Sequence, residues 1–193
     1  MNSFVDTGIL LGGFFALISV LVARENQVAI FRREWLNKTS DELEEFSLKA
    51  RENLFEIVVL EEVDNAHLVT VKELSLVVTL IRSRMNVKEK LVKDMMVNMK
   101  SVVQALLEYS KVKKKLIAAN ENGEEVIDLE REEDVKNKIV YRAIERFEKS
   151  KYIYFKSEWV RLKEGEFFTK LSMYGCGAFV GLLVLKFILD LYS

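Results

Sequence analysis

Uncharged, mostly apolar stretches lie near both ends of the chain, and residues 24–170, which are rich in charged side chains, separate them. No Asp, Glu, Lys or Arg occurs in residues 7–23 or in residues 171–185. A helix needs about 20 predominantly apolar residues to cross a hydrocarbon core about 30 Å thick. Residues 4–23 and 171–192 reach that length, so the pattern predicts two transmembrane helices.

A different pattern follows the first apolar stretch. Apolar or small side chains recur every three or four residues, which is typical of one face of a helix. No helix breaker separates them from the first apolar stretch, so we expect one continuous helix whose part after the membrane covers residues 24–63, about 60 Å. The stripe consists of Val28, Phe31, Trp35, Thr39, Leu43, Phe46, Ala50, Leu54 and Ile57.

Three more helices are expected, over residues 66–85, 87–119 and 129–170. Asp64-Asn65, Asn86 and the loop at residues 120–125 carry the turn-forming residues between them. The second helix has apolar positions at Val69, Leu74, Val77, Val78 and Ile81. The last has them at Ile139, Ile144, Phe147, Tyr152, Phe155, Trp159 and Leu162.

Composition supports a chain made of long helices. The sequence has no proline, the residue that breaks helix interiors. Six of its eight glycines lie in the two apolar stretches, which leaves only Gly123 and Gly165 between them. We therefore expect an all-α membrane protein: two transmembrane helices, N- and C-terminal, and a bundle of long helices over residues 24–170.

The distribution of charge argues against nucleic acid as a partner and predicts the orientation of the chain in a membrane. Residues 24–170 hold 28 of the 29 Lys and Arg and 28 of the 30 Asp and Glu. This balance argues against a nucleic-acid binder, which needs an excess of basic side chains. Basic side chains also flank the inner ends of both stretches, which predicts a cytoplasmic bundle in a two-pass inner-membrane protein of bacteria. They are Arg24, Arg32, Arg33 and Lys38, then Lys151, Lys156, Arg161, Lys163 and Lys170.

The start of the chain does not resemble a secretory signal. Such a signal has a basic first region and a small-residue cleavage site. Residues 1–6 contain an acidic side chain, Asp6, and no Lys or Arg. We therefore expect residues 4–23 to be a membrane helix, with both termini outside the cytoplasm.

Catalytic and cofactor motifs are not expected. His67 and Cys176 are the only histidine and the only cysteine, so the spacings of metal-ligand motifs cannot occur. The chain has no glycine-rich phosphate loop and no pattern of nucleophile and base. The sequence thus predicts no enzyme activity and no cofactor. His67 is interpreted as a capping or packing residue and Cys176 as a small packing residue.

Each apolar stretch contains a glycine pair spaced by four, Gly8 with Gly12 and Gly177 with Gly181. Such pairs allow close approach of membrane helices. We expect the two helices to pack against each other or around the axis of a homo-oligomer.

Three ionisable residues lie at the outer ends of the expected membrane helices: Asp6, Lys186 and Asp190. Charged groups inside a bilayer are costly unless they are paired or hydrated. Antiparallel helices place the three at similar depth, where they can form a polar cluster or, in an oligomer, a gate. The alternative is that Lys186 extends to the outer headgroups.

The expected loop at residues 120–125 separates two blocks of opposite charge. Residues 111–115 read KVKKK, and residues 124–134 hold seven acidic side chains against one basic one, Arg131. A hairpin about Gly123 brings the blocks together. They form either a solvated tip with local ion pairs or a docking site for a cytoplasmic protein. The candidate docking residues are Lys113, Lys114, Lys115, Glu124 and Glu125.

Two aromatic motifs resemble those of a group of small bacterial two-span membrane proteins, most of them of unassigned function. One is Phe-Arg-x-x-Trp after the first span, here Phe31, Arg32 and Trp35. The other is a Lys-x-Glu-Trp-x-x-x-Lys pattern before the second span, here Lys156, Glu158, Trp159 and Lys163.

Some proteins of this build act as membrane effectors of anti-phage systems, including retrons. The resemblance implies an effector that oligomerises and permeabilises or depolarises the inner membrane when triggered. The alternative function is a membrane-anchored helical scaffold or adaptor that recruits a cytoplasmic partner.

Overall fold

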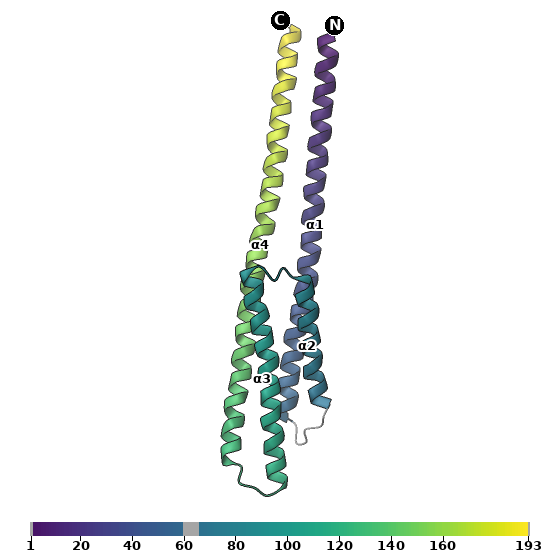
Figure 1. Ribbon diagram of the computed structural model, residues 1–193. Helices are drawn as coiled ribbons and strands as arrows, with labels where there is room; N and C mark the ends of the chain where they lie inside the picture. The colour runs from purple at the N-terminus through teal and green to yellow at the C-terminus, as the bar shows by residue number, and fades with distance from the viewer. Residues whose placement is uncertain (1, 60–65, 193) are drawn as a thin grey trace. The chain divides into compact units, whose positions relative to one another are not determined.

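The computed structural model describes residues 2–59 and 66–192, and all regular structure in them is helical. Helix α1 spans Asn2–Val59, α2 Ala66–Arg84, α3 Lys90–Glu121 and α4 Ile127–Tyr192 (Figure 1). Within these residues, side chains are described at every position except 2–11, 14, 17, 66–70, 72, 168, 169, 172, 183, 186, 187 and 190–192. The expected all-α class is confirmed.

Within the described residues, no helix is both long enough and apolar enough to serve as a membrane span.

The chain divides into two compact units. Unit 1 consists of Met1–Leu36 with Glu158–Ser193, and unit 2 of Asn37–Ser157. Helices α1 and α4 therefore contribute residues to both units, whereas α2 and α3 belong to unit 2 alone. Each unit has its own packing and is described separately.

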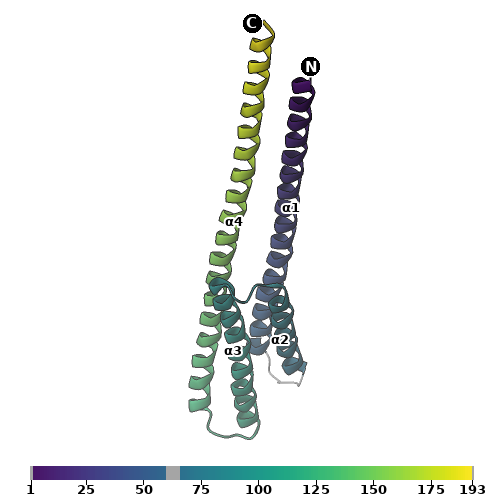
Figure 2. The same cartoon turned by 45° about the horizontal axis from the view of Figure 1, so that its top comes forward.

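Unit 2 is a four-helix bundle in which consecutive helices run antiparallel (Figures 1 and 2). Helix α3 contributes the largest share of the interior because its buried side chains recur every three or four residues along its whole length. Several of them are methionines, whose unbranched side chains fill irregular gaps between helices. The stripe on α3 includes Val92, Met95, Met99, Val102, Leu106, Tyr109, Val112 and Leu116.

The stripe expected on α1 is correct over its second half and wrong at its start. Thr39 and every later member of the stripe are buried, with exposed fractions between 0 and 4%. Val28 and Phe31 are 49% and 69% exposed, and Trp35 is half-buried. Helical spacing determines which side chains share a face of α1, but it does not determine how far along that face another helix covers them.

The expected stripe on α4 was partly wrong because the buried face includes charged side chains. Tyr152 and Trp159 are exposed, and so is Ile139 at 42%. Lys151 and Glu158, each one residue earlier than an exposed aromatic, are 7% and 5% exposed. The apolar side chains alone therefore predicted the wrong face for this part of the helix. The buried stripe is Val140, Ala143, Ile144, Phe147, Lys151, Tyr154, Glu158 and Leu162.

Short turns join the last three helices. The Asn86 side chain accepts a hydrogen bond from the backbone amide of Lys88, at 3.2 Å, between α2 and α3. After α3, Gly123 adopts a φ of +69°. The amide of Gly123 donates to the carbonyl of Asn120 (3.2 Å) and that of Glu124 to Ala119 (2.9 Å), which is the Schellman arrangement. The turn expected at Asp64-Asn65 lies outside the described residues.

Unit 1 contains two helical segments that run antiparallel beside each other, so that the two termini lie at the same end (Figures 1 and 2). An ion pair between Arg33 Nη2 and Glu166 Oε1, at 2.5 Å, links them. Most of the large apolar side chains described on these segments are exposed. They include Phe15, Val20, Leu21, Leu171, Met173, Tyr174, Phe179, Leu182, Val184, Leu185, Ile188 and Leu189.

Replacing Gly123 by alanine tests the turn after α3. Because a side chain at positive φ is strained, we expect Gly123→Ala to lower the free energy of unfolding by about 1 kcal/mol. Gly165→Ala is the control: Gly165 lies inside α4, where an added Cβ meets nothing within 4 Å. Alanine there should raise stability by roughly 0.5–1 kcal/mol. Thermal unfolding followed by circular dichroism measures both, and equal effects would contradict the role of Gly123.

Candidate functional site: a buried ion-pair cluster between α1 and α4

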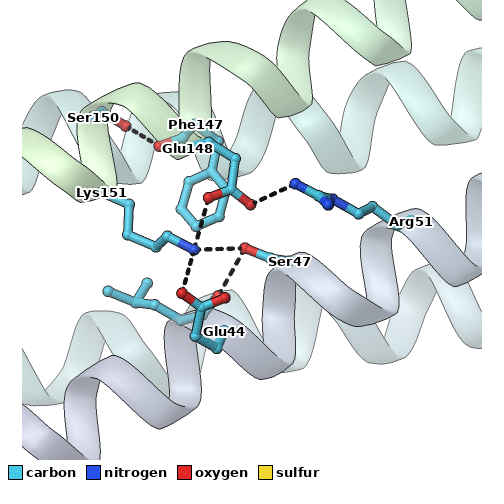
Figure 3. Close-up of polar contacts among 8 residues, drawn as sticks. Glu44, Ser47, Arg51, Phe147, Glu148, Ser150 and Lys151 are labelled. Atoms are coloured by element: carbon cyan, nitrogen blue, oxygen red, sulfur yellow. Dashed lines mark hydrogen bonds and ion pairs between the residues drawn. The ribbon is translucent and has the colours of Figure 1, made fainter.

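A buried lysine connects α4 to α1 inside unit 2 (Figure 3). The Lys151 side chain is 8% exposed. Its Nζ lies 2.9 Å from Glu44 Oε1 on α1 and 2.7 Å from Glu148 Oε2 on α4. It also donates to Ser47 Oγ at 3.2 Å. A lysine ammonium has three donors, so these three acceptors satisfy it completely.

Neighbouring side chains hold this group in place. Arg51 Nη2 lies 3.3 Å from Glu148 Oε1, so Glu148 bridges two cations (Figure 3). Ser47 donates to the backbone carbonyl of Leu43, one turn earlier, at 3.1 Å. The Phe147 ring centroid is 5.8 Å from Lys151 Nζ, within the range of a cation–π contact.

The electrostatics of the cluster favour ionised Glu148. Its burial raises the pKa, but the hydrogen bond from Lys151 and the charges of Lys151 and Arg51 lower it by more. The net pKa of Glu148 lies below its ordinary value of 4.5. Glu148 is therefore a carboxylate at neutral pH, and the cluster is a paired set of charges.

The cluster faces an open groove between the two helices. A hollow of about 400 Å³ is lined by Glu44, Ser47, Leu48, Arg51, Glu148, Lys151, Tyr152 and Phe155. A second hollow of about 590 Å³ lies next to it, since it shares Arg51 and Glu148, and it is more apolar. The remaining lining residues of the second hollow are Leu54, Phe55, Val58, Tyr141, Ile144 and Glu145.

This arrangement serves to couple helices. All donors of Lys151 are engaged by protein acceptors, two of which are carboxylates. Separating α1 from α4 removes two of the three acceptors of Lys151, Glu44 and Ser47, and leaves only Glu148 of its own helix. Among the described residues, no group of three or more His, Cys, Asp or Glu could hold a metal ion.

A second polar cluster joins α3 to α4. Tyr109 Oη and Lys113 Nζ both donate to Glu133 Oε1, at 3.2 and 2.8 Å. Burial and the neighbouring charge of Glu133 raise the pKa of Tyr109. Lys136 Nζ donates to Glu108 Oε2 at 2.8 Å, and this hydrogen bond is the main reason why the pKa of Glu108 is lowered.

One of the five candidate docking residues, Lys113, belongs to this second cluster. The hairpin about Gly123 does bring the two charged blocks together, because Lys113 pairs with Glu133 at 2.8 Å. The other candidate docking residues remain on the surface. They are Lys114, Lys115, Glu124 and Glu125.

Four of the residues singled out in the apolar stretches are described: Gly12, Cys176, Gly177 and Gly181. An added Cβ at Gly12, Gly177 or Gly181 meets nothing within 4 Å, so these glycines are not in close contact with the other helical segment of unit 1. The side chains of Asp6, Lys186 and Asp190, together with Gly8 and His67, lie outside the described residues. Cys176 is a half-buried free thiol.

Sequence patterns had missed the Lys151 cluster. Apolar periodicity treats a lysine as a surface residue, whereas here Lys151 occupies a core position between Phe147 and Tyr154. A usable signal is present, because Ile144, Phe147, Lys151, Tyr154 and Glu158 recur every three or four residues. A charged residue inside such a stripe indicates a buried ion pair.

Comparisons with protein-family models, with curated proteins and with solved structures found no match for this chain.

Removing the buried ammonium tests the coupling of α1 to α4. We expect Lys151→Ala to lower the free energy of unfolding by about 2 kcal/mol, less than the 3–5 kcal/mol of a fully buried pair because the carboxylates stay partly hydrated. Arg142→Ala, which alters an exposed cationic side chain of the same helix, is the control and should change stability by less than about 0.5 kcal/mol. Chemical denaturation of the purified full chain measures both variants. Similar losses would argue against the cluster.

Acid should remove the contribution of Glu148 to the stability of the folded protein. Its pKa is lowered on folding, so the stability that it supplies is present above pH 4.5 and is lost as the pH falls through the folded-state pKa. We therefore expect Glu148→Gln to be less stable than the parent at pH 7, and the difference to shrink as the pH falls below 4.5. Unfolding midpoints measured at pH 7 and at acidic pH report the difference. A gap that stays constant between them would contradict this assignment.

Proposed function

We propose that this chain is a two-span inner-membrane protein whose helical bundle lies in the cytoplasm and whose spans assemble with those of other copies. In this proposal a trigger received by the bundle causes the assembled spans to permeabilise or depolarise the membrane. The proposed spans are residues 4–23 and 171–192, which contain the uncharged stretches 7–23 and 171–185.

The observation that carries the proposal is the exposure of apolar side chains around both helical segments of unit 1. On α4, Tyr174, Leu182 and Leu189 are 76%, 64% and 61% exposed. On α1, Val20 is 67% exposed. Helices that present apolar side chains on every side are stable only where another apolar phase covers them, and a bilayer supplies one.

Assembly is supported by the glycines. Gly177 and Gly181 share one face of α4, and open space surrounds the position of a Cβ at each. Gly12 on α1 is equally open. A glycine face that no described residue approaches within 4 Å is suited to close contact with a helix of another copy.

Orientation and the biological setting rest on the sequence. Basic residues gather at the inner ends of both proposed spans, which favours a cytoplasmic bundle. The resemblance to two-span effectors suggests anti-phage defence as the setting.

Substituting one glycine tests the proposed activity. We expect Gly177→Leu to reduce depolarisation at least about tenfold when the protein is induced under triggering conditions, because leucine keeps the spans apart. Gly175→Leu is the control, since Gly175 lies on the same helix, has equally open surroundings and points away from the face of Gly177. A potential-sensitive dye in cells measures the effect. The proposed activity is overturned if the parent protein leaves the membrane potential unchanged.

A scaffold or adaptor is the second candidate, and one observation favours it. A groove of about 590 Å³ between α3 and α4 includes the exposed apolar side chains Val97 and Ile139, at 53% and 42%. Helix grooves of this kind accept an amphipathic helix of a partner. A scaffold would leave the membrane potential unchanged, and a cytoplasmic protein bound there would be lost on Val97→Asp.

A further inference from the structure

Helix α1 carries a second stripe, on its outer surface. Its members alternate in steps of four and three, the spacing of a coiled-coil contact, and all are exposed. Leu48, Phe55 and Val59 are 58%, 68% and 59% exposed, so the stripe presents large apolar side chains at the surface of the described residues. Its charged members are all acidic. The stripe consists of Asp41, Glu45, Leu48, Glu52, Phe55 and Val59.

Helix α4 carries a matching outer stripe across the groove. Its members recur in steps of three and four, and all are exposed. Tyr141 and Tyr152 supply the apolar surface, at 59% and 65% exposure. Three of its four charged members are lysines. The stripe consists of Lys138, Tyr141, Glu145, Lys149, Tyr152 and Lys156.

The groove between the two stripes is continuous. Its two hollows, of about 400 and 590 Å³, share Arg51 and Glu148 as lining residues. The lining residues on α1 run from Glu44 to Val58, which corresponds to about 21 Å of helix. One face of unit 2 therefore combines a groove, an acidic edge on α1 and a basic edge on α4.

We propose that this face binds the same face of a second copy of the chain, about a two-fold axis parallel to the helices. The proposal rests on the assembly of copies in the proposed function and names the surface through which the bundles meet. The rotation places α1 of each copy on α4 of the other, so acidic stripes lie on basic stripes at both edges. A two-fold axis across the helices would place acidic α1 on acidic α1, which charge repulsion disfavours.

Contacts within the chain set the register of this dimer. Glu44 pairs with Lys151 and Arg51 with Glu148, which fixes the residues of α1 and α4 that lie at the same height. A rotation about an axis parallel to the helices leaves that height unchanged. Asp41 of one copy then lies opposite Lys156 of the other to within one turn. By the same argument, Phe55 lies opposite Tyr141 of the second copy.

Cross-linking of the full chain in membranes tests this geometry. All copies carry Cys176→Ala, which removes the native thiol. A copy with Asp41→Cys and one tag is expressed with a second copy that has Lys156→Cys and another tag. We expect a short bis-maleimide to join the two tags in one product. The matched control replaces Asp41→Cys by Leu76→Cys, an α2 position that is 65% exposed, and should give at least about tenfold less product.

Two results would overturn the proposal. One is a yield no higher than that of the Leu76→Cys control. The other is a product formed by copies that carry only Asp41→Cys, because this requires α1 to face α1.

Charge exchange provides an independent measurement. Asp41→Lys alone and Lys156→Asp alone should each weaken dimerisation several-fold, because each places like charges opposite each other. Combining them in one chain should restore dimerisation, because residues 41 and 156 then again carry opposite charges. Phe55→Asp should abolish the dimer, while the equally exposed Leu76→Asp should not. Circular dichroism confirms that these surface variants remain folded. Failure of the combined variant to restore dimerisation would contradict the charge pairing.

This inference and the proposed activity can fail separately. Depolarisation without the expected cross-link would keep the activity and exclude this interface. The cross-link without depolarisation would keep the interface and exclude the activity.

Discussion

A lysine ammonium that is almost removed from water must have a partner for every donor, and in unit 2 this requirement connects two helices that are far apart in sequence. Lys151 on α4 reaches Glu44 and Ser47 on α1, while Glu148 joins it from its own helix. Sliding either helix by one turn would take Glu44 and Ser47 away from Lys151 and leave two of its three donors without these acceptors, which is costly in the interior. Apolar contacts alone tolerate such shifts better, because they have no direction. The register of α1 against α4 therefore depends on this cluster, and so does the shape of the groove beside it.

The same two helices present the surfaces that the chain leaves uncovered. In unit 2 these are an acidic stripe on α1 and a basic stripe on α4, each with large apolar side chains. In unit 1 they are apolar side chains around both segments and glycines with open surroundings. Unpartnered surface on α1 and α4 in both units is what a protein that assembles with copies of itself needs. The proposed activity and the proposed bundle interface both draw on this property.

Periodicity predicted the buried faces well wherever the core is purely apolar. The stripe on α1 from Thr39 to Ile57 and the interior positions Leu74, Val78 and Ile81 of α2 were correct. It predicted wrongly on α4, where Lys151 and Glu158 occupy core positions and displace Tyr152 and Trp159 to the surface. Hydrophobicity cannot identify a buried charge, because what makes burial acceptable is a partner on another helix.

The candidate sites also differ in how far local sequence predicts them. The hairpin about Gly123 could be predicted from local sequence, since a glycine at positive φ ends a helix by backbone preference alone. The spacing around Lys151 indicates that this lysine is buried, but its partners on α1 could not be predicted, because Glu44 and Lys151 are 107 positions apart and only packing brings them together.

The sequence by itself thus determined the helical class, the approximate helix lengths and the turns after α2 and α3, which all follow from short-range spacing and the conformational limits of proline and glycine. Only the tertiary structure decided which face of α4 is buried, which charges are paired and which surfaces of α1 and α4 remain open. Those depend on contacts between residues far apart in the chain.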